Sequence, residues 1–223
     1  MDLWGGSTLA IYLLLVFGVT FLSLDNLIDA IADQGWYIWD DFLSVEQVRD
    51  LCQEMPENWR TAQIGRSDSK HQNQRRRSDK IQWLQPTMGF AVQDYLERME
   101  HIRHNVNRAL FLGLFEYEAH FAKYDIGDAY EKHYDAFQGR TNRRLTTVMY
   151  LNEHWTEADG GKLKLYSDQD ELIETVAPYA GRLVVFLSER FPHEVCVSHA
   201  ERFSIAGWFR TNGVSEQCFD ISR

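Results

Sequence analysis

The sequence predicts a mainly β protein with helices packed against the outside of a double-sheet jelly roll. Before residue 115, apolar residues recur mostly at helical spacing, which indicates helices flanking the sheets. From residue 115 onward, the chain consists of short, β-branched and aromatic segments separated by turn residues. This count of short strands suits a double-sheet jelly roll. The expected strands are 115–124, 131–135, 144–152, 162–166, 172–177, 182–187, 193–197 and 203–210.

The part of the chain before residue 115 contains two expected helices and one expected loop. Ser44 and Gln47 have the spacing of a capping box, so a helix is expected to begin there. A longer apolar stripe at helical spacing follows, and it indicates core packing: Met88, Val92, Tyr95, Met99, Ile102, Val106 and Leu110. Between the two helices, residues 65–80 are polar and lack an apolar period. We expect them to form a mobile loop, because long polar loops in compact domains are often functional lids.

Length, charge and cysteine content limit the classes of protein to which this chain can belong. A chain of 223 residues fits one domain with a short N-terminal extension. A net charge of −10 argues against nonspecific binding to nucleic acid. The three cysteines, Cys52, Cys196 and Cys218, are odd in number and lack the spacing of a metal site. They therefore indicate reduced thiols and a cytoplasmic location for the folded domain.

The first segment of the chain is unusually apolar. Residues 8–24 carry no charge and approach the length of about 20 residues that spans a bilayer. No Lys or Arg occurs before Arg49, so the segment has neither a basic signal-peptide start nor flanking positive charge. Three interpretations remain open: a membrane anchor, a buried helix, or an extension that is not part of the working protein.

Four residues in the second half of the chain form a candidate metal and anion site. His133 and Asp135 are two positions apart, so on a strand they would face the same side. His193, which follows a separate strand, would complete a two-histidine, one-carboxylate triad. Such a triad leaves three positions on the metal open and is typical of non-heme Fe(II) oxygenases. Arg202 could then hold the carboxylate of an organic acid beside the metal with two parallel hydrogen bonds.

Around these residues, the chain resembles the 2-oxoglutarate- and Fe(II)-dependent oxygenases. Within that superfamily, it resembles the prolyl hydroxylase domains of the oxygen-sensing type. The matching stretches are RRLTTVMYLNEHWTEADGGKLKLY at 143–166 and VAPYAGRLVVFLSERFPHEVCVSHAERFSIAGWF at 176–209. A further match, RSDKIQW at 77–83, is similar to a segment beside the substrate groove of the family. The likeness runs from about residue 35 to 210.

The resemblance implies a double-stranded β-helix core of the cupin-like jelly-roll type and an enzyme that hydroxylates prolyl residues of proteins at the 4-position. The co-substrates would be 2-oxoglutarate and O2, the metal Fe(II), the products succinate and CO2, and ascorbate a reductant. The resemblance implies that His133, Asp135 and His193 are the metal ligands. It also implies that Arg202, Tyr124 and Tyr150 contact 2-oxoglutarate. Candidates for the substrate groove are Arg77, Trp83 and Arg143. Ala206 stands where animal relatives carry a hydroxylated residue, so one co-substrate hydrogen bond is missing or replaced.

The resulting domain division has four parts. Residues 1–24 are the apolar segment, 25–114 a supporting region with the 65–80 loop, 115–213 the oxygenase core and 214–223 a tail. The expected partner is a proline-containing protein or peptide, with no nucleic acid; a membrane is a partner only if residues 8–24 are an anchor. Two alternatives remain open: a hydroxylase of free amino acids or small metabolites, and a non-catalytic binding module with the same fold. The sequence does not indicate an oligomeric state.

Overall fold

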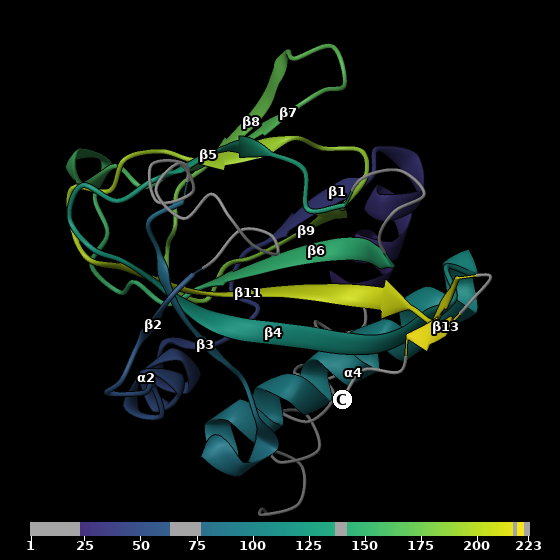
Figure 1. The fold of residues 1–223 in the computed structure, drawn as a ribbon, viewed down its shortest axis with the longest axis horizontal. Helices are drawn as coiled ribbons and strands as arrows, with labels where there is room; N and C mark the ends of the chain where they lie inside the picture. The colour runs from purple at the N-terminus through teal and green to yellow at the C-terminus, as the bar shows by residue number, and fades with distance from the viewer. Residues whose placement is uncertain (1–22, 63–76, 137–141, 216–217, 221–223) are drawn as a thin grey trace, which may run out of the picture.

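The computed structural model describes residues 23–62, 77–136, 142–215 and 218–220, and Figure 1 shows their arrangement. In this part of the chain, a large seven-stranded sheet faces a small four-stranded sheet, and a short hairpin lies near the C-terminus. The large sheet has the order β1-β9-β6-β11-β4-β3-β2. Its strands are β1 (Trp36–Trp39), β2 (Arg60–Thr61), β3 (Lys80–Trp83), β4 (Leu114–Tyr124), β6 (Arg143–Tyr150), β9 (Leu183–Leu187) and β11 (Arg202–Thr211).

The small sheet has the order β5-β10-β7-β8. Its strands are β5 (Tyr130–His133), β7 (Leu163–Tyr166), β8 (Leu172–Val176) and β10 (His193–Val195). The C-terminal hairpin consists of β12 (Gly213–Ser215) and β13 (Cys218–Asp220), which lie in the region expected to be a tail. In Figure 1, the β7–β8 hairpin extends away from the rest of the molecule. All paired strands are antiparallel, as a double-stranded β-helix requires.

Helices cover the face of the large sheet that points away from the small sheet. They comprise a helix at residues 23–33, α2 (Val45–Gln53) and α4 (Phe90–Leu110), with short 3-10 turns η1 (Pro86–Met88) and η2 (Glu157–Asp159). The predicted capping box is confirmed, because the Gln47 backbone N–H donates to Ser44 Oγ at 3.3 Å and the Ser44 N–H donates to Gln47 Oε1 at 3.0 Å. The predicted stripe on α4 is also confirmed: Val92, Tyr95, Met99, Ile102 and Val106 are buried.

Alternation along the central strands separates two hydrophobic clusters. On β4, Ala119 and Phe121 join the cluster beneath the helices, whereas Ala122 and Tyr124 join the cluster that faces the small sheet. Strands β6, β9 and β11 divide their side chains in the same way, because successive residues of a strand point to opposite faces. The large sheet is therefore buried on both faces, and the space between the two sheets is lined by every second residue.

All eight predicted strands are present, with bounds that differ from the prediction by at most a few residues. The mainly β jelly roll with flanking helices is thus confirmed. Strands from before residue 115 also join the large sheet, since β1 pairs with β9 and β3 pairs with β4. The supporting region and the expected core consequently share one sheet.

Two expectations concern residues that lie largely outside the described part. Of the apolar segment at 8–24, only Ser23 and Leu24 are described; they begin the helix at 23–33, and Leu24 is buried. Among the described residues, no helix has both the length and the apolar character needed to cross a membrane. Of the loop expected at 65–80, only residues 77–80 are described. Arg77 forms an isolated β-bridge with Tyr130, and Lys80 begins β3. The end of the expected loop therefore takes part in β structure.

Candidate active site

The structure brings His133, Asp135 and His193 together between the two sheets. His133 ends β5, His193 begins β10, and the two residues are directly opposite each other in that strand pair. One ligand atom from each of the three side chains lies within 4.8 Å of the other two. Asp135 Oδ1 is 3.5 Å from His133 Nε2, and Oδ2 is 3.4 Å from His193 Nε2. This arrangement is a two-histidine, one-carboxylate facial triad.

The local reasoning that placed Asp135 on a strand is wrong. β5 ends at His133, and Asp135 lies in the bend that follows it. Its carboxylate is oriented by a hydrogen bond from Thr146 Oγ1 on β6, at 2.8 Å, rather than by the alternation of a strand. The three side chains meet because a loop residue is held by a neighbouring strand.

Hydrogen bonds fix the orientation of both imidazoles. Nδ1 of His133 lies 2.8 Å from the Glu131 carbonyl oxygen, and Nδ1 of His193 lies 3.2 Å from that of Phe191. A carbonyl only accepts, so each Nδ1 carries the hydrogen and each Nε2 presents its lone pair to the site. Burial lowers the pKa of His193 to about 4, which keeps its ring neutral and ready to bind a metal.

The carboxylate of the triad is held in its charged form. Burial alone would raise the pKa of Asp135, but at the low pH where this carboxyl would titrate, the interactions with the protonated forms of His193 and His133 outweigh burial and hold the pKa well below its ordinary value. Two imidazole nitrogens and one carboxylate suit Fe(II) and leave part of its coordination sphere open. The donor set therefore fits a non-heme iron centre.

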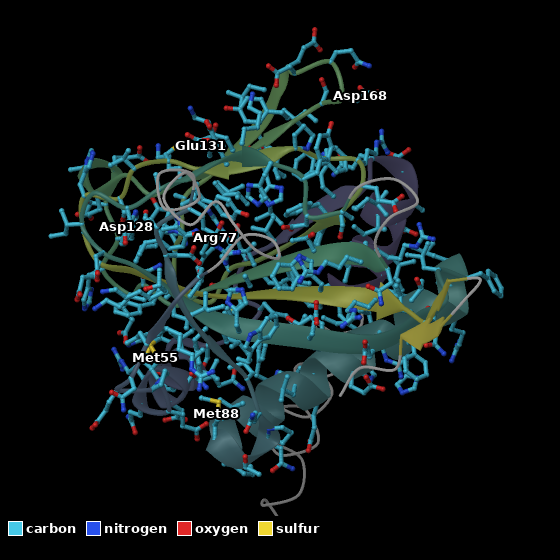
Figure 2. The ribbon with its side chains drawn as sticks, in the orientation of Figure 1. Met55, Arg77, Met88, Asp128, Glu131 and Asp168 are labelled. Carbon is cyan, nitrogen blue, oxygen red and sulfur yellow. The ribbon has the colours of Figure 1, made fainter. Side chains whose placement is uncertain are left out.

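A cavity of about 290 Å³ extends from the triad between the sheets. Figure 2 shows Arg77 in this space, on the opposite side of the large sheet from Met55 and Met88, which lie among the helices. All but one of the residues that the sequence suggested for the site line this one cavity. They are His133, Asp135, His193, Arg202, Tyr124, Arg77, Trp83 and Arg143. Tyr150 does not line the cavity, but its ring lies 5.1 Å from the guanidinium carbon of Arg202.

Arg202 is deeply buried beside the triad, with 1% of its surface exposed. Its guanidinium carbon lies over the rings of Tyr124 at 4.9 Å and Tyr150 at 5.1 Å. Its Nε donates to the Gly161 carbonyl at 2.9 Å and its Nη1 to Ser204 Oγ at 3.2 Å, but among the described residues it has no carboxylate partner.

A buried guanidinium without a counter-ion is costly, so this position fits an anionic ligand. The Tyr150 hydroxyl supports the same interpretation, because it is buried without a hydrogen-bond partner among the described residues. Gly161 allows the close approach of Arg202: a Cβ there would lie 3.0 Å from Arg202 Cδ, and its φ of +57° favours glycine. The site therefore provides a metal triad at one end and an anion pocket at the other.

The outer part of the cavity is built differently, from paired charges and an exposed indole. Arg77 donates to Asp79 at 2.6 and 2.9 Å, and its guanidinium lies 4.9 Å from the Tyr130 ring. Trp83 is 42% exposed and therefore lies at the entrance. The Arg77 side chain is thus held in place by groups of the protein itself.

Arg143 also lines this cavity. It donates to Glu118 at 2.9 Å and stacks over the Trp208 ring at 3.6 Å. Glu118 also accepts a hydrogen bond from Arg210, so one carboxylate orients two guanidinium groups.

Sequence reasoning missed His120, which lines the cavity between Trp83 and Trp208. Burial, and next the positive charge of Arg77, lower its pKa to about 4, so its ring is neutral. The alternation of β4 was a usable signal: His120 lies on the same face as Tyr124, four residues later. Sequence reasoning also missed Thr146, because no local sequence pattern marks this residue.

The chain matches known proteins at this site. Residues 119–210 match the 2OG-Fe(II) oxygenase superfamily, whose members use Fe(II), 2-oxoglutarate and O2. The triad and the buried arginine lie within the matched range, and the double-stranded β-helix is the fold of that superfamily. The chain belongs to this superfamily of oxygen-activating enzymes.

Within the superfamily, the chain belongs to the prolyl hydroxylases. A solved structure of a Pseudomonas putida prolyl-4-hydroxylase is 38% identical, with a TM-score of 0.77 over 85% of this chain and 100% of that chain. A prolyl hydroxylase from Trichoplax adhaerens, solved with a hypoxia inducible factor oxygen degradation domain peptide fragment, is 27% identical. Its TM-score is 0.71 over 84% of this chain and 88% of that chain.

Curated relatives agree with this assignment. The hypoxia-inducible factor prolyl hydroxylase of Caenorhabditis elegans is 27% identical over 92% of this chain and 30% of that protein. Egl nine homolog 1 of Homo sapiens is 26% identical over 84% of this chain and 46% of that protein. The chain thus spans about a third to a half of the length of these two proteins.

Proposed function

We propose that this protein is a 2-oxoglutarate- and Fe(II)-dependent prolyl 4-hydroxylase that acts on a proline-containing protein, yielding succinate and CO2. The observation that carries the proposal is that one cavity contains both the facial triad and a buried Arg202 that has no carboxylate partner among the described residues. A triad alone would fit many metal sites. An additional anion pocket in the same cavity fits a reaction that needs a dicarboxylate co-substrate.

His133, Asp135 and His193 would hold Fe(II), and Arg202 would bind the distal carboxylate of 2-oxoglutarate. Bound iron supplies the activation of dioxygen for hydroxylation. The protein contributes orientation and exclusion of water. The rings of Tyr124 and Tyr150 lie against the guanidinium of Arg202. The Tyr150 hydroxyl, which has no hydrogen-bond partner among the described residues, would donate to the anion as well. We assign Ser204 as the hydroxyl that replaces the one missing at Ala206, since it lies on the same strand face and contacts Arg202.

The rim supports a peptide rather than a free amino acid as substrate. A free amino acid would need a charged partner for its own carboxylate and ammonium groups inside the cavity. Instead, the guanidinium groups of Arg77 and Arg143 are each engaged by an acid, Asp79 and Glu118 respectively. The Trp83 and Trp208 indoles form an apolar wall between them, which suits a neutral prolyl ring within a chain.

The thiols support a reducing compartment as the place of action. Cys52 and Cys196 are free, as expected for a protein of the cytoplasm.

The test is a reaction of the purified full chain with Fe(II), 2-oxoglutarate and a library of proline-containing peptides. Succinate and the gain of one oxygen atom in peptide mass would be measured together. We expect both to appear only for peptides that contain a suitable proline, and neither to appear when that proline is replaced by alanine. Succinate that rises equally with free proline or a small metabolite would contradict the peptide assignment.

A further inference from the structure

The carboxylate of Asp135 is held by a short chain of hydroxyl groups outside the triad. Thr146 Oγ1 on β6 donates to Asp135 Oδ2 at 2.8 Å, and the same oxygen lies 2.9 Å from Ser188 Oγ, just after β9. Thr146 is 2% exposed and Ser188 is fully buried. Neither residue lies next to a triad residue in the sequence.

The direction of this chain follows from the capacity of each group. An ionised carboxylate only accepts, so the single hydroxyl hydrogen of Thr146 is committed to Asp135. Thr146 must accept from its other neighbour. Ser188 therefore donates to Thr146, and Thr146 donates to Asp135, so both hydroxyl hydrogens are assigned.

This order affects the two carboxylate oxygens unequally. The oxygen that accepts from Thr146 is Oδ2, whereas Oδ1 accepts no hydrogen bond from a hydroxyl group among the described residues. A donated hydrogen bond reduces the availability of Oδ2 for a metal, so the carboxylate presents Oδ1. A ligand that binds through one oxygen leaves room for the co-substrate, whereas one that binds through both would occupy an additional position.

We propose that Thr146 and Ser188 are positioning residues that hold Asp135 as a one-oxygen ligand and thereby keep metal positions open for 2-oxoglutarate. The inference rests on the proposed metal site and goes beyond it. Hydrogen-bond partners of a metal-ligating group set its orientation, and their loss typically costs metal affinity. Here Thr146 lies on β6 and Ser188 directly follows β9, so two paired strands of the large sheet position the groups that orient a ligand in a bend.

The neighbouring residue Thr147 provides a matched control. It lies on the same strand, is fully buried, and its hydroxyl bonds to the Tyr117 hydroxyl at 2.8 Å, on the face away from the triad. Replacing either threonine by valine removes one buried hydroxyl from β6. The two variants differ in whether that hydroxyl touches the metal ligand.

The experiment measures Co²⁺ binding to the purified full chain by absorption titration, without turnover. We expect Thr146→Val to weaken Co²⁺ binding by about 10- to 100-fold, the range for loss of such a partner. Ser188→Ala should weaken it less, and Thr146→Ser, which keeps the hydroxyl, should bind close to wild type. Thr147→Val should lower the melting temperature but leave Co²⁺ affinity unchanged.

A second titration adds 2-oxoglutarate to the Co²⁺-loaded variants at saturating metal. Thr146→Val should bind 2-oxoglutarate more weakly than Thr147→Val, because the released carboxylate can take a second metal position. Equal Co²⁺ affinity in the two valine variants would overturn the inference. If Thr146→Val fails to fold, the comparison of Ser188→Ala with wild type decides, and equal affinities there would also overturn it. Failure of the proposed function would look different: the affinities would differ as expected, but no peptide would gain oxygen.

Discussion

The two ends of the cavity are stabilised in different ways. At the inner end, Arg202 is buried, lacks a carboxylate partner among the described residues and is fixed by ring stacking and a carbonyl. At the outer end, Arg77 and Arg143 are each paired with an acid of the protein. A buried charge left without a counter-ion implies a ligand that supplies one, whereas charges that are already paired form a scaffold. The inner end should therefore be sensitive to single changes and the outer end tolerant.

The largest effect is expected from Asp135→Ala. This change removes the only anionic ligand of the triad, so metal binding and succinate formation should both fall to background. Metal content after dialysis and succinate yield are the two measurements. A variant that still turns over at the wild-type rate would remove Asp135 from the metal site.

Next in size is Arg202→Lys, which keeps the positive charge but loses the planar fork that meets a carboxylate with two hydrogen bonds. Loss of a hydrogen bond to a charged group costs about 1.5 to 3 kcal/mol. The KM for 2-oxoglutarate should therefore rise by roughly 10- to 100-fold, with metal affinity unchanged. An unaltered dependence on 2-oxoglutarate would assign the anion pocket to another residue.

A third prediction compares Gly161→Ala with Gly113→Ala and tests whether Arg202 must keep its position to bind the anion. A Cβ at Gly161 would press against Arg202 Cδ at 3.0 Å, whereas one at Gly113 would meet nothing within 4 Å; φ is +57° and +67° respectively. Both variants should lose about 1 kcal/mol of stability from backbone strain. Only Gly161→Ala should also weaken 2-oxoglutarate binding, measured by titration of the metal-loaded protein. Equal binding in both variants would show that Arg202 tolerates displacement.

His120, between the two ends, predicts a pH dependence of stability. Its pKa falls from 6.5 to about 4 on folding, so the unfolded state binds more protons between those values. The contribution of this group to stability is complete above about pH 6.5 and is lost as pH falls toward 4. His120→Phe should flatten that part of the stability curve by about 1 to 3 kcal/mol, measured by chemical unfolding of the metal-free protein. An unchanged slope in the variant would assign the loss to other groups.

The smallest effect is expected at the rim. Arg143→Ala removes a partly exposed ion pair and one stacking partner of Trp208, so the KM for the peptide should rise by about two- to fivefold. Arg210→Ala is the matched control, because Arg210 pairs with the same Glu118 but does not line the cavity. If the two variants behave alike, Arg143 has no specific role toward the peptide.

The sequence predicted the fold well because its strands alternate and its helices carry clear apolar stripes. The sequence also predicted that the triad and Arg202 lie close together, and the shared strand face of Arg202 and Ser204 can be identified from spacing alone. Sequence reasoning failed to predict contacts between residues that lie far apart in the chain. Asp135 is held by a hydrogen bond from Thr146 on β6 rather than by strand alternation. Arg143 and Glu118, which form an ion pair, are 25 positions apart in the sequence.

The most direct test of the central claim is the fate of labelled oxygen. The full chain would react with Fe(II), 2-oxoglutarate, isotope-labelled O2 and a peptide substrate found in the library. The account predicts that the peptide gains one labelled oxygen on a prolyl residue for each succinate formed beyond the uncoupled background. Label that enters the peptide from water instead, or on a residue other than proline, would contradict the assignment as a prolyl hydroxylase.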